Sequence, residues 1–297
     1  MIHNYIIGID GGGSHCRAIL QNSDGKHIGE GVSGASNIMS DPHKALSSII
    51  SASETAIADA NLSVSLSDVV VMAGLAGANI PKAKDYFLSL PLPFKQTHIM
   101  SDLHAACIGA HRGANGALII CGTGSAATNY INGEFTDLGG YGLNLGDNAS
   151  AAWLGLHAVK STLLTMDGVE KENKLASDVI AHLGINSAQE LVAILSAYQP
   201  SEFGALAPLV TKNYKLGCNM ANELIQAGAD YISSLIFALL EQRNTAKDDE
   251  KDMSVCFVGG LANIYIPLLS SSARKLLSSP KANAQEGAIH YFTAFSG

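Results

Sequence analysis

The sequence predicts an α/β protein made of two structurally related halves. Short apolar runs typical of buried strands alternate with segments whose apolar residues recur at helical spacing. Three of the predicted strands end in glycine-rich turns. One plan of strand, glycine turn and strand occurs twice, about a hundred residues apart, and the length of 297 residues corresponds to about two domains. These observations favour two α/β domains of similar design.

The composition excludes several classes of function. Hydrophobic residues make up 47% of the chain and charged residues 15%, which is typical of a globular protein with a large core. The formal net charge is −8 and no block of Lys and Arg occurs, so neither nucleic acid nor a membrane surface is an expected partner. The five cysteines are scattered and form no C-x-x-C pair, which argues against a disulfide framework and a zinc knuckle. No secretory signal is recognised and no apolar run is long enough to span a bilayer, so we expect a cytoplasmic protein.

The first half opens with three strands joined by two tight turns. The strands are predicted at Tyr5–Ile9, Arg17–Leu20 and about His27–Val32. The first turn is Asp10-Gly11-Gly12-Gly13-Ser14 and the second contains Asp24-Gly25. This segment therefore predicts a small antiparallel sheet.

The rest of the first half alternates helix and strand. Asp41-Pro42 predicts a helix start, because Asp suits the N-cap and Pro the first helical position. Val69–Met72 is a continuous apolar run, as expected for a buried parallel strand. A later strand, His98–Met100, ends at Ser101-Asp102, and a helix over Leu103–Arg112 follows directly.

The second half repeats the plan and adds helices. A strand at Ala117–Ile120 meets the turn Gly122-Thr123-Gly124-Ser125, and Asn132-Gly133 supplies the next hairpin turn. Further on, Val255–Val258 is a buried strand that ends at Gly259-Gly260. Helices are predicted at Trp153–Thr165, Leu191–Tyr198, Asn219–Arg243 and 284 to about 292. We expect an N-terminal domain over 1–112 and a C-terminal domain over 113–283 with a helical insertion, with the helix 284–297 packing back on the first domain.

The three glycine turns predict a nucleotide site. Glycine lets the backbone approach a ligand closely, so that successive N–H groups can converge on phosphate oxygens. A single turn of this kind is more often a plain hairpin, but three at strand ends favour a phosphate cradle. The first turn is followed by a strand and is therefore no dinucleotide fingerprint, and neither a P-loop nor a G-x-S-x-G elbow occurs.

Three ordered segments carry a family resemblance. They are Ile7–Ser14, Cys121–Ser125 and Phe257–Leu261. These segments resemble the phosphate-1, phosphate-2 and adenosine motifs of the actin-like ATPase and sugar kinase superfamily. The whole chain is similar to the BadF/BadG/BcrA/BcrD ATPase family and, within it, to N-acetylglucosamine and glucosamine kinases. The resemblance implies two ribonuclease-H-like domains, with ATP and sugar meeting in an interdomain cleft.

The resemblance also implies the roles of two aspartates. Asp102 matches the catalytic aspartate of the amino-sugar kinases, and its place at a strand end suits a general base for the attacking hydroxyl. The alternative interpretation is that Asp102 only caps the helix that follows. Asp10 is expected to hold Mg²⁺, directly or through water, although it could instead accept the amide of Gly12 or Gly13 in a local turn.

The other candidates divide into phosphate and sugar ligands. Expected to bind ATP phosphates are Gly11, Gly12, Gly13, Ser14, Gly122, Thr123, Gly124, Ser125, Gly259 and Gly260. Expected to bind the sugar are Asn37, Asp102, Thr123, Gly140 and Asp147. Asn37 and Asp147 match sugar-contacting positions of the family, and a polyol is recognised by rigidly placed amide and carboxylate groups. In Gly146-Asp147-Asn148-Ala149 the chain departs from the mammalian type, which has glutamate and then glycine after the aspartate.

The leading hypothesis is an ATP-dependent kinase, with ATP and Mg²⁺ as cofactors, that phosphorylates the 6-hydroxyl of N-acetylglucosamine or glucosamine. The alternative is an ATPase of the same family that activates a dehydratase or reductase through an iron–sulfur cluster shared by two subunits. The scattered cysteines do not show the pairing that such a cluster requires. Dimers are common among the kinases that the chain resembles, so a homodimer is an open expectation.

Overall fold

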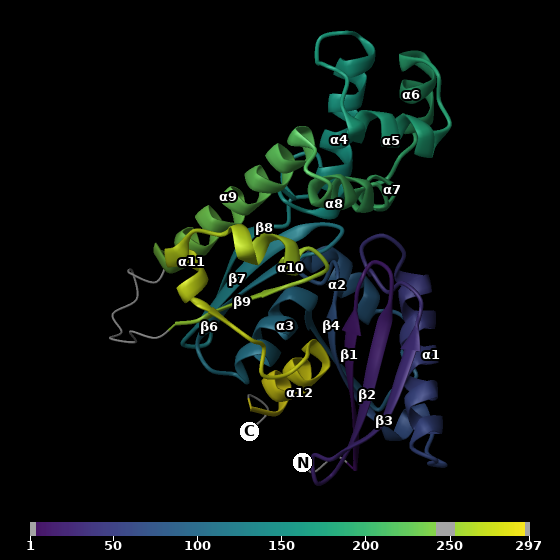
Figure 1. Ribbon diagram of the computed structural model, residues 1–297. Coiled ribbons are helices and arrows are strands. Elements are labelled where there is room, and N and C mark those ends of the chain that lie inside the picture. Colours follow the sequence, from purple (N-terminus) through teal and green to yellow (C-terminus); the bar gives the residue numbers. More distant parts are fainter. Residues whose placement is uncertain (1–3, 242–252, 295–297) are drawn as a thin grey trace. The chain divides into compact units, whose positions relative to one another are not determined.

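The computed structural model describes residues 4–241 and 253–294 (Figure 1). By their internal contacts these residues form two compact units. The first combines residues 4–118, 128–136 and 279–294, and the second contains residues 119–127 and the described part of 137–278. Residues 242–243 of the predicted helix Asn219–Arg243 and residues 295–297 lie outside the described residues.

The first unit is built on a mixed five-stranded sheet in the order β3-β2-β1-β4-β5. Its strands are β1 (Tyr5–Gly11), β2 (Cys16–Asn22), β3 (His27–Ser33), β4 (Val70–Leu75) and β5 (Gln96–Ser101). The first three strands pair antiparallel, whereas β4 pairs parallel with both β1 and β5. All five predicted strands of this half are therefore confirmed, and each is one to three residues longer in total than predicted, although β4 begins one residue later.

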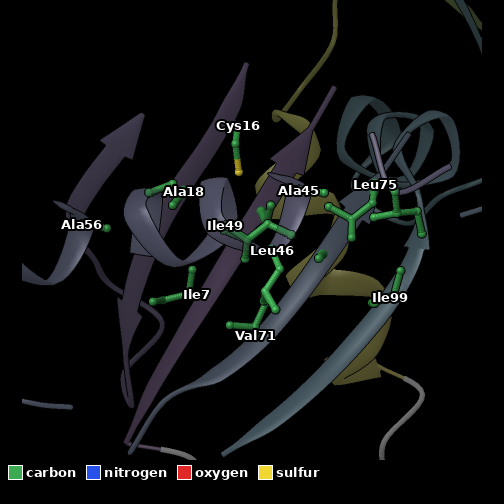
Figure 2. Packing of buried hydrophobic residues seen from close by; sticks show 14 of the residues in the cluster. Ile7, Cys16, Ala18, Ala45, Leu46, Ile49, Ala56, Val71, Leu75 and Ile99 are labelled. Atoms are coloured by element: carbon green, nitrogen blue, oxygen red, sulfur yellow. The ribbon is translucent and has the colours of Figure 1, made fainter. Parts of the chain in front are cut away.

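Successive side chains of a strand point to opposite faces of the sheet, and different helices cover the two faces. Alternate residues of β1, such as Ile7 and Ile9, are buried against α1 (Pro42–Asp59), and Figure 2 shows Ile7, Val71 and Ile49 meeting in this core. The helix begins as predicted, because the Asp41 side chain accepts a hydrogen bond from the Lys44 amide and Pro42 follows it. The first unit also contains two short helices, η1 (Leu66–Asp68) and α2 (Pro81–Leu88).

The opposite face is covered by α3 (Asp102–His111) and α12 (Ala284–Ala294). Three glycines make this packing possible. A Cβ on Gly8 of β1 would lie 2.5 Å from the Gln285 carbonyl oxygen, and a Cβ on Gly287 would lie 2.0 Å from that of Ala105. On α3, a Cβ on Gly109 would lie 2.0 Å from the Asn283 carbonyl oxygen. α12 thus packs directly on α3, the helix that begins with Asp102.

The second sheet has the order β10-β9-β6-β7-β8. Its strands are β6 (Gly116–Cys121), β7 (Ser125–Ile131), β8 (Glu134–Gly139), β9 (Val255–Val258) and β10 (Leu277–Ser278). Read from β8, the order β8-β7-β6-β9-β10 reproduces the order of the first sheet, which confirms the predicted repeat. Asn132 and Gly133 both have positive φ in the hairpin turn, at 52° and 93°. Two mixed sheets of this order form the ribonuclease-H-like arrangement that the resemblance implied.

Most of the described helices belong to the second unit. They are α4 (Ala151–Met166), α5 (Lys174–Leu183), α6 (Ala188–Leu195), α7 (Pro200–Gly204), α8 (Ala207–Lys215), α9 (Asn219–Glu241), α10 (Ala262–Tyr265), η3 (Ile266–Leu268) and α11 (Ser271–Lys275). The predicted helices correspond to α4, α6 and α9, whereas α5, α7, α8, α10 and α11 were not predicted. Of the described helices, α9 alone is long and apolar enough to cross a membrane, but its residues from Ala221 to Leu239 bury one side among other elements, as a core helix does.

Candidate active site

Asp10 lies near the carboxyl end of β1, beside the first glycine turn. The register of the hairpin sets Asp10 opposite Arg17, and their side chains form a loose ion pair with 3.6 Å between Oδ2 and Nη1. The Gly12 amide donates to the His15 carbonyl oxygen at 2.9 Å, so the turn is closed without the Asp10 carboxylate. Burial raises the pKa of Asp10, and the Arg17 guanidinium offsets part of that rise.

The glycines of this turn differ in what surrounds them. A Cβ on Gly11 would lie 2.5 Å from Leu75 and 2.7 Å from the Ser36 hydroxyl, so packing alone requires glycine there. A Cβ on Gly13 would meet no protein atom within 4 Å. Ser14 follows in the same turn and is exposed. The outer part of the turn is therefore open to a ligand.

Asn37 lies between β3 and α1, where its side chain closes a local turn. Its Oδ1 accepts hydrogen bonds from the amides of Met39 at 2.9 Å and Ser40 at 3.2 Å. A Cβ on Gly77, whose φ is +86°, would lie 3.0 Å from the same oxygen. The side-chain oxygen of Asn37 thus already accepts two hydrogen bonds. A contact from Asn37 to a sugar would come from its side-chain nitrogen.

Asp102 is the first residue of α3 and not its N-cap. Ser101 is the N-cap, because its hydroxyl accepts a hydrogen bond from the His104 amide at 3.1 Å. Of the Asp102 carboxylate, Oδ1 accepts the Leu103 amide at 2.9 Å. Asp102 is therefore not the N-cap of α3, although its carboxylate accepts one of the first amides of that helix.

The surroundings of Asp102 favour its protonated form. Burial is the main cause and the Asp10 carboxylate adds to it, and together they raise the pKa of Asp102 to about 6 despite the Leu103 hydrogen bond. A raised carboxyl pKa close to neutrality is a property of general bases. Two carboxylates of the first unit, Asp10 and Asp102, thus lie close enough to influence each other.

In the second unit, the turn Gly122–Ser125 is tied to the start of α4. The Gly122 and Thr123 carbonyl oxygens accept hydrogen bonds from the Ala151 amide at 2.9 Å and the Ala152 amide at 3.1 Å. The Ser125 hydroxyl is buried and donates to the Asn148 carbonyl oxygen at 2.7 Å, whereas Thr123 is exposed. Of the two hydroxyl side chains in this turn, that of Thr123 is exposed and that of Ser125 is buried.

Asp147 lies against this turn in an unusual backbone conformation. Its φ is +54°, which non-glycine residues seldom adopt, and the side chain is buried. The carboxylate accepts the Ser125 and Gly142 amides, and a Cβ on Gly124 would lie 2.8 Å from Oδ2. Burial raises the pKa of Asp147, and these two amides offset part of that rise. Asp147 therefore holds the turn together in addition to any sugar contact.

Gly140 and Gly259 occupy positions where the backbone requires glycine. Gly140 has a φ of +71° and donates its amide to the Ser125 carbonyl oxygen at 3.0 Å. Gly259 has a φ of +111°, and a Cβ there would lie 2.1 Å from the Cys121 carbonyl oxygen. The Gly259-Gly260 segment is thereby brought against the strand that leads into the Gly122–Ser125 turn.

Three predicted phosphate ligands share one property. At Gly13, Gly122 and Gly260 a Cβ would meet no protein atom within 4 Å, and none of the three has positive φ. Neither packing nor backbone conformation therefore accounts for glycine at these positions. Close approach of a ligand to the main chain would account for it.

Sequence analysis missed several residues of this site. Arg17 was not predicted to pair with Asp10, although the hairpin register would have indicated it. Tyr265 and Cys121 both donate hydrogen bonds to the Ala149 carbonyl oxygen, at 2.8 Å and 3.0 Å. Tyr231 is hydrogen-bonded to the Asn148 side chain. No local pattern marks these contacts, because the partners are far apart in the chain.

Comparison with known sequences finds relatives along nearly the whole chain. The profile of the BadF/BadG/BcrA/BcrD ATPase family matches residues 7–290. The chain is 31% identical to the glucosamine kinase GspK of Vibrio cholerae, over 97% of this chain and 95% of that protein. It is 26% identical to the N-acetylmuramic acid/N-acetylglucosamine kinase of Clostridium acetobutylicum, over 92% and 90% of the two chains.

A solved structure has the same fold along nearly the whole chain. It is the crystal structure of a protein from Chromobacterium violaceum that is provisionally named N-acetylglucosamine kinase. The TM-score is 0.87 at 28% sequence identity, and the match covers 97% of this chain and 99% of the other.

Proposed function

The chain belongs to the BadF/BadG/BcrA/BcrD ATPase family, and on this premise we propose that it transfers the γ-phosphate of ATP to the 6-hydroxyl of an amino sugar. Relatives across nearly its full length are named glucosamine kinase and N-acetylglucosamine kinase. The proposal takes either of these two sugars as the acceptor.

The observation that carries the proposal is the environment of Asp102. A general base for an alcohol needs a pKa near the operating pH and an oxygen that can reach the proton of the attacking hydroxyl. Ser101 relieves Asp102 of helix capping, and the pKa of Asp102 is raised to about 6. The open glycines Gly13, Gly122 and Gly260 supply backbone that a triphosphate can approach.

In the proposed reaction, the sugar O6 attacks the γ-phosphorus and its proton passes to the Asp102 carboxylate. The bond from the γ-phosphorus to the bridging oxygen breaks, and its electron pair leaves with ADP. The exposed Thr123 hydroxyl and the amides of its turn bind phosphate oxygens, and Asn37 and Asp147 orient the sugar. Holding the reactants in line supplies much of the rate in such a transfer.

Asp10 fits a magnesium ion bound with ATP. Its side chain is 28% exposed and its ion pair with Arg17 is loose, so a carboxylate oxygen is available to a hard cation. Among residues 4–241 and 253–294, no group of three or more His, Cys, Asp or Glu side chains could hold a metal by itself. Mg²⁺ would therefore depend on phosphate and water oxygens as further ligands, and it would neutralise phosphate charge during transfer.

The proposal is tested by measuring ADP release from Mg²⁺-ATP with N-acetylglucosamine, glucosamine, glucose or no sugar, and by identifying the phosphosugar. We expect sugar-dependent ADP release and a matching 6-phosphate. An Asp102→Asn preparation, purified in parallel, reports any contaminating kinase. Sugar-independent hydrolysis, or none at all, would contradict the proposal and favour an activating ATPase. That alternative has little support, because Cys16, Cys107, Cys121 and Cys256 are buried in their own units.

A further inference from the structure

The loop Asp147–Ser150, which connects the glycine turn segment to α4, is held in a strained backbone conformation. Asp147 and Ala149 have φ values of +54° and +65°, and neither is a glycine. Left-handed conformations are unfavourable for residues with a Cβ, so they persist only where surrounding contacts impose them. The contacts that impose this loop are therefore part of what places the Asp147 carboxylate.

One such contact comes from Tyr265, the last residue of α10. Its side chain has no exposed surface, and its hydroxyl donates to the Ala149 carbonyl oxygen at 2.8 Å across 116 residues of sequence. The Cys121 thiol donates to the same oxygen at 3.0 Å. The ring cannot swing away, because it lies against Gly228 of α9, where a Cβ would come within 2.6 Å of the phenol oxygen.

The position of Tyr265 in the chain gives this contact its significance. Its helix, α10, begins two residues after Gly260, and Gly259 packs on the Cys121 carbonyl oxygen. The Gly259–Gly260 segment, the Cys121 thiol and the Ala149 carbonyl group are therefore joined in one rigid cluster. The cluster holds the loop at the Ala149 carbonyl group, whereas the Ser125 and Gly142 amides hold the Asp147 carboxylate.

We propose that Tyr265 is a positioning residue for sugar binding: its hydroxyl holds Ala149, and through it Asp147, in the conformation that contacts the sugar. The inference rests on the proposed function and extends it to a residue outside the predicted motifs. It assigns Tyr265 no contact with substrate and no part in proton transfer.

The first test is Tyr265→Phe, which removes the hydroxyl and keeps the ring. We expect KM for the sugar to rise by about three- to tenfold, the effect of one hydrogen bond, while kcat and KM for ATP stay within about twofold of wild type. The matched control is Thr162→Val in α4, which also removes a buried hydroxyl that donates to a carbonyl oxygen, here Ala158 at 2.8 Å. The control should lower Tm without changing KM for the sugar.

A second measurement does not depend on any activity. Hydrogen exchange of peptides covering residues 147–154 should be faster in Tyr265→Phe than in wild type, with α8 unchanged. If wild type releases no sugar-dependent ADP, the proposed function fails, but this exchange measurement still tests the contact. If Tyr265→Phe does not fold, Cys121→Ala removes the other donor to Ala149 and should change exchange and sugar KM in the same direction.

Two results would overturn the inference. Unchanged exchange of residues 147–154 in a folded Tyr265→Phe variant would show that the hydroxyl does not hold the loop. Faster exchange with an unchanged sugar KM would show that the loop conformation matters for the fold and not for the sugar.

Discussion

At the scale of single residues, the environment that suits Asp102 for catalysis also destabilises its charged form. Burial disfavours its charged form, yet a general base must be charged to accept a proton. Asp102→Asn should therefore lower kcat by at least about a hundredfold while ATP and sugar still bind, because only proton transfer is lost. Steady-state kinetics and isothermal titration measure the two effects. The control is Asp85→Asn, a change of an exposed side chain in α2 of the same unit. Near-wild-type turnover of Asp102→Asn would show that Asp102 is not the general base.

The raised pKa of Asp102 also predicts how activity depends on pH. With a pKa of about 6, the carboxylate is protonated progressively as pH falls through 6. The value of kcat/KM for the sugar should consequently fall about tenfold for each pH unit below that point, as expected for one essential base. A pH–rate profile between pH 5 and about 8 tests this expectation. A kcat/KM that stays level down to about pH 5, as the ordinary carboxyl pKa of 3.8 would give, would contradict it.

The same residue should affect stability with a defined sign. The folded-state pKa of about 6 lies above the ordinary value of 3.8, so the folded state binds a proton before the unfolded state as pH falls. Wild type therefore gains stability between pH 6 and 4, whereas Asp102→Asn lacks this contribution. At pH 7 the variant should have the higher Tm, by about 2–4 °C for each kcal/mol of relieved desolvation. Calorimetry of both proteins should show that the Tm difference between them is smaller at pH 4 than at pH 7.

At the scale of elements, Gly259 and Gly260 form an internal pair for comparison. Gly259→Ala should destabilise or unfold the protein, because a Cβ would lie 2.1 Å from the Cys121 carbonyl oxygen at a φ of +111°. Gly260→Ala should keep the wild-type Tm but weaken ATP binding, because its Cβ enters open space that we assign to nucleotide. A loss of about tenfold in ATP affinity corresponds to roughly 1.4 kcal/mol. Thermal unfolding and nucleotide titration separate the two effects, and unchanged ATP affinity in Gly260→Ala would argue against that assignment.

Helix starts were predicted where a short local signal exists. The start of α1 follows the predicted Asp41-Pro42, since the cap and the Lys44 amide that it accepts lie within three residues. The helix predicted at Leu191–Tyr198 corresponds to α6, which begins three residues earlier, after its N-cap Ser187. α7, α10 and α11 have five residues or fewer and were missed. Such short helices carry less than two turns of apolar spacing, so their packing decides their conformation.

At the scale of the whole molecule, the chain returns to its first unit through α12. Gly287→Ala should lower the free energy of unfolding by about 1–3 kcal/mol, the usual effect of overpacking, because a Cβ would lie 2.0 Å from the Ala105 carbonyl oxygen of α3. Chemical denaturation measures this change. Gly13→Ala serves as the control for stability, since its Cβ meets no protein atom within 4 Å. Equal stability of the two variants would show that α3 and α12 can move apart to accommodate a Cβ without loss of stability.

The sequence by itself determined the α/β class, the repeated strand plan and the glycine turns, and with them the candidate residues Asp10, Asp102 and Asp147. These features are local: a strand, a turn or a cap depends on residues within a few positions of one another. Only the tertiary structure decided that Ser101 caps α3 in place of Asp102, and that Asp147 is clamped by Ser125 and Gly142. It also decided that Tyr265 reaches Ala149 across 116 residues. Such contacts depend on how elements pack, because side-chain spacing along the chain carries no information about which distant backbone group will lie within hydrogen-bond distance.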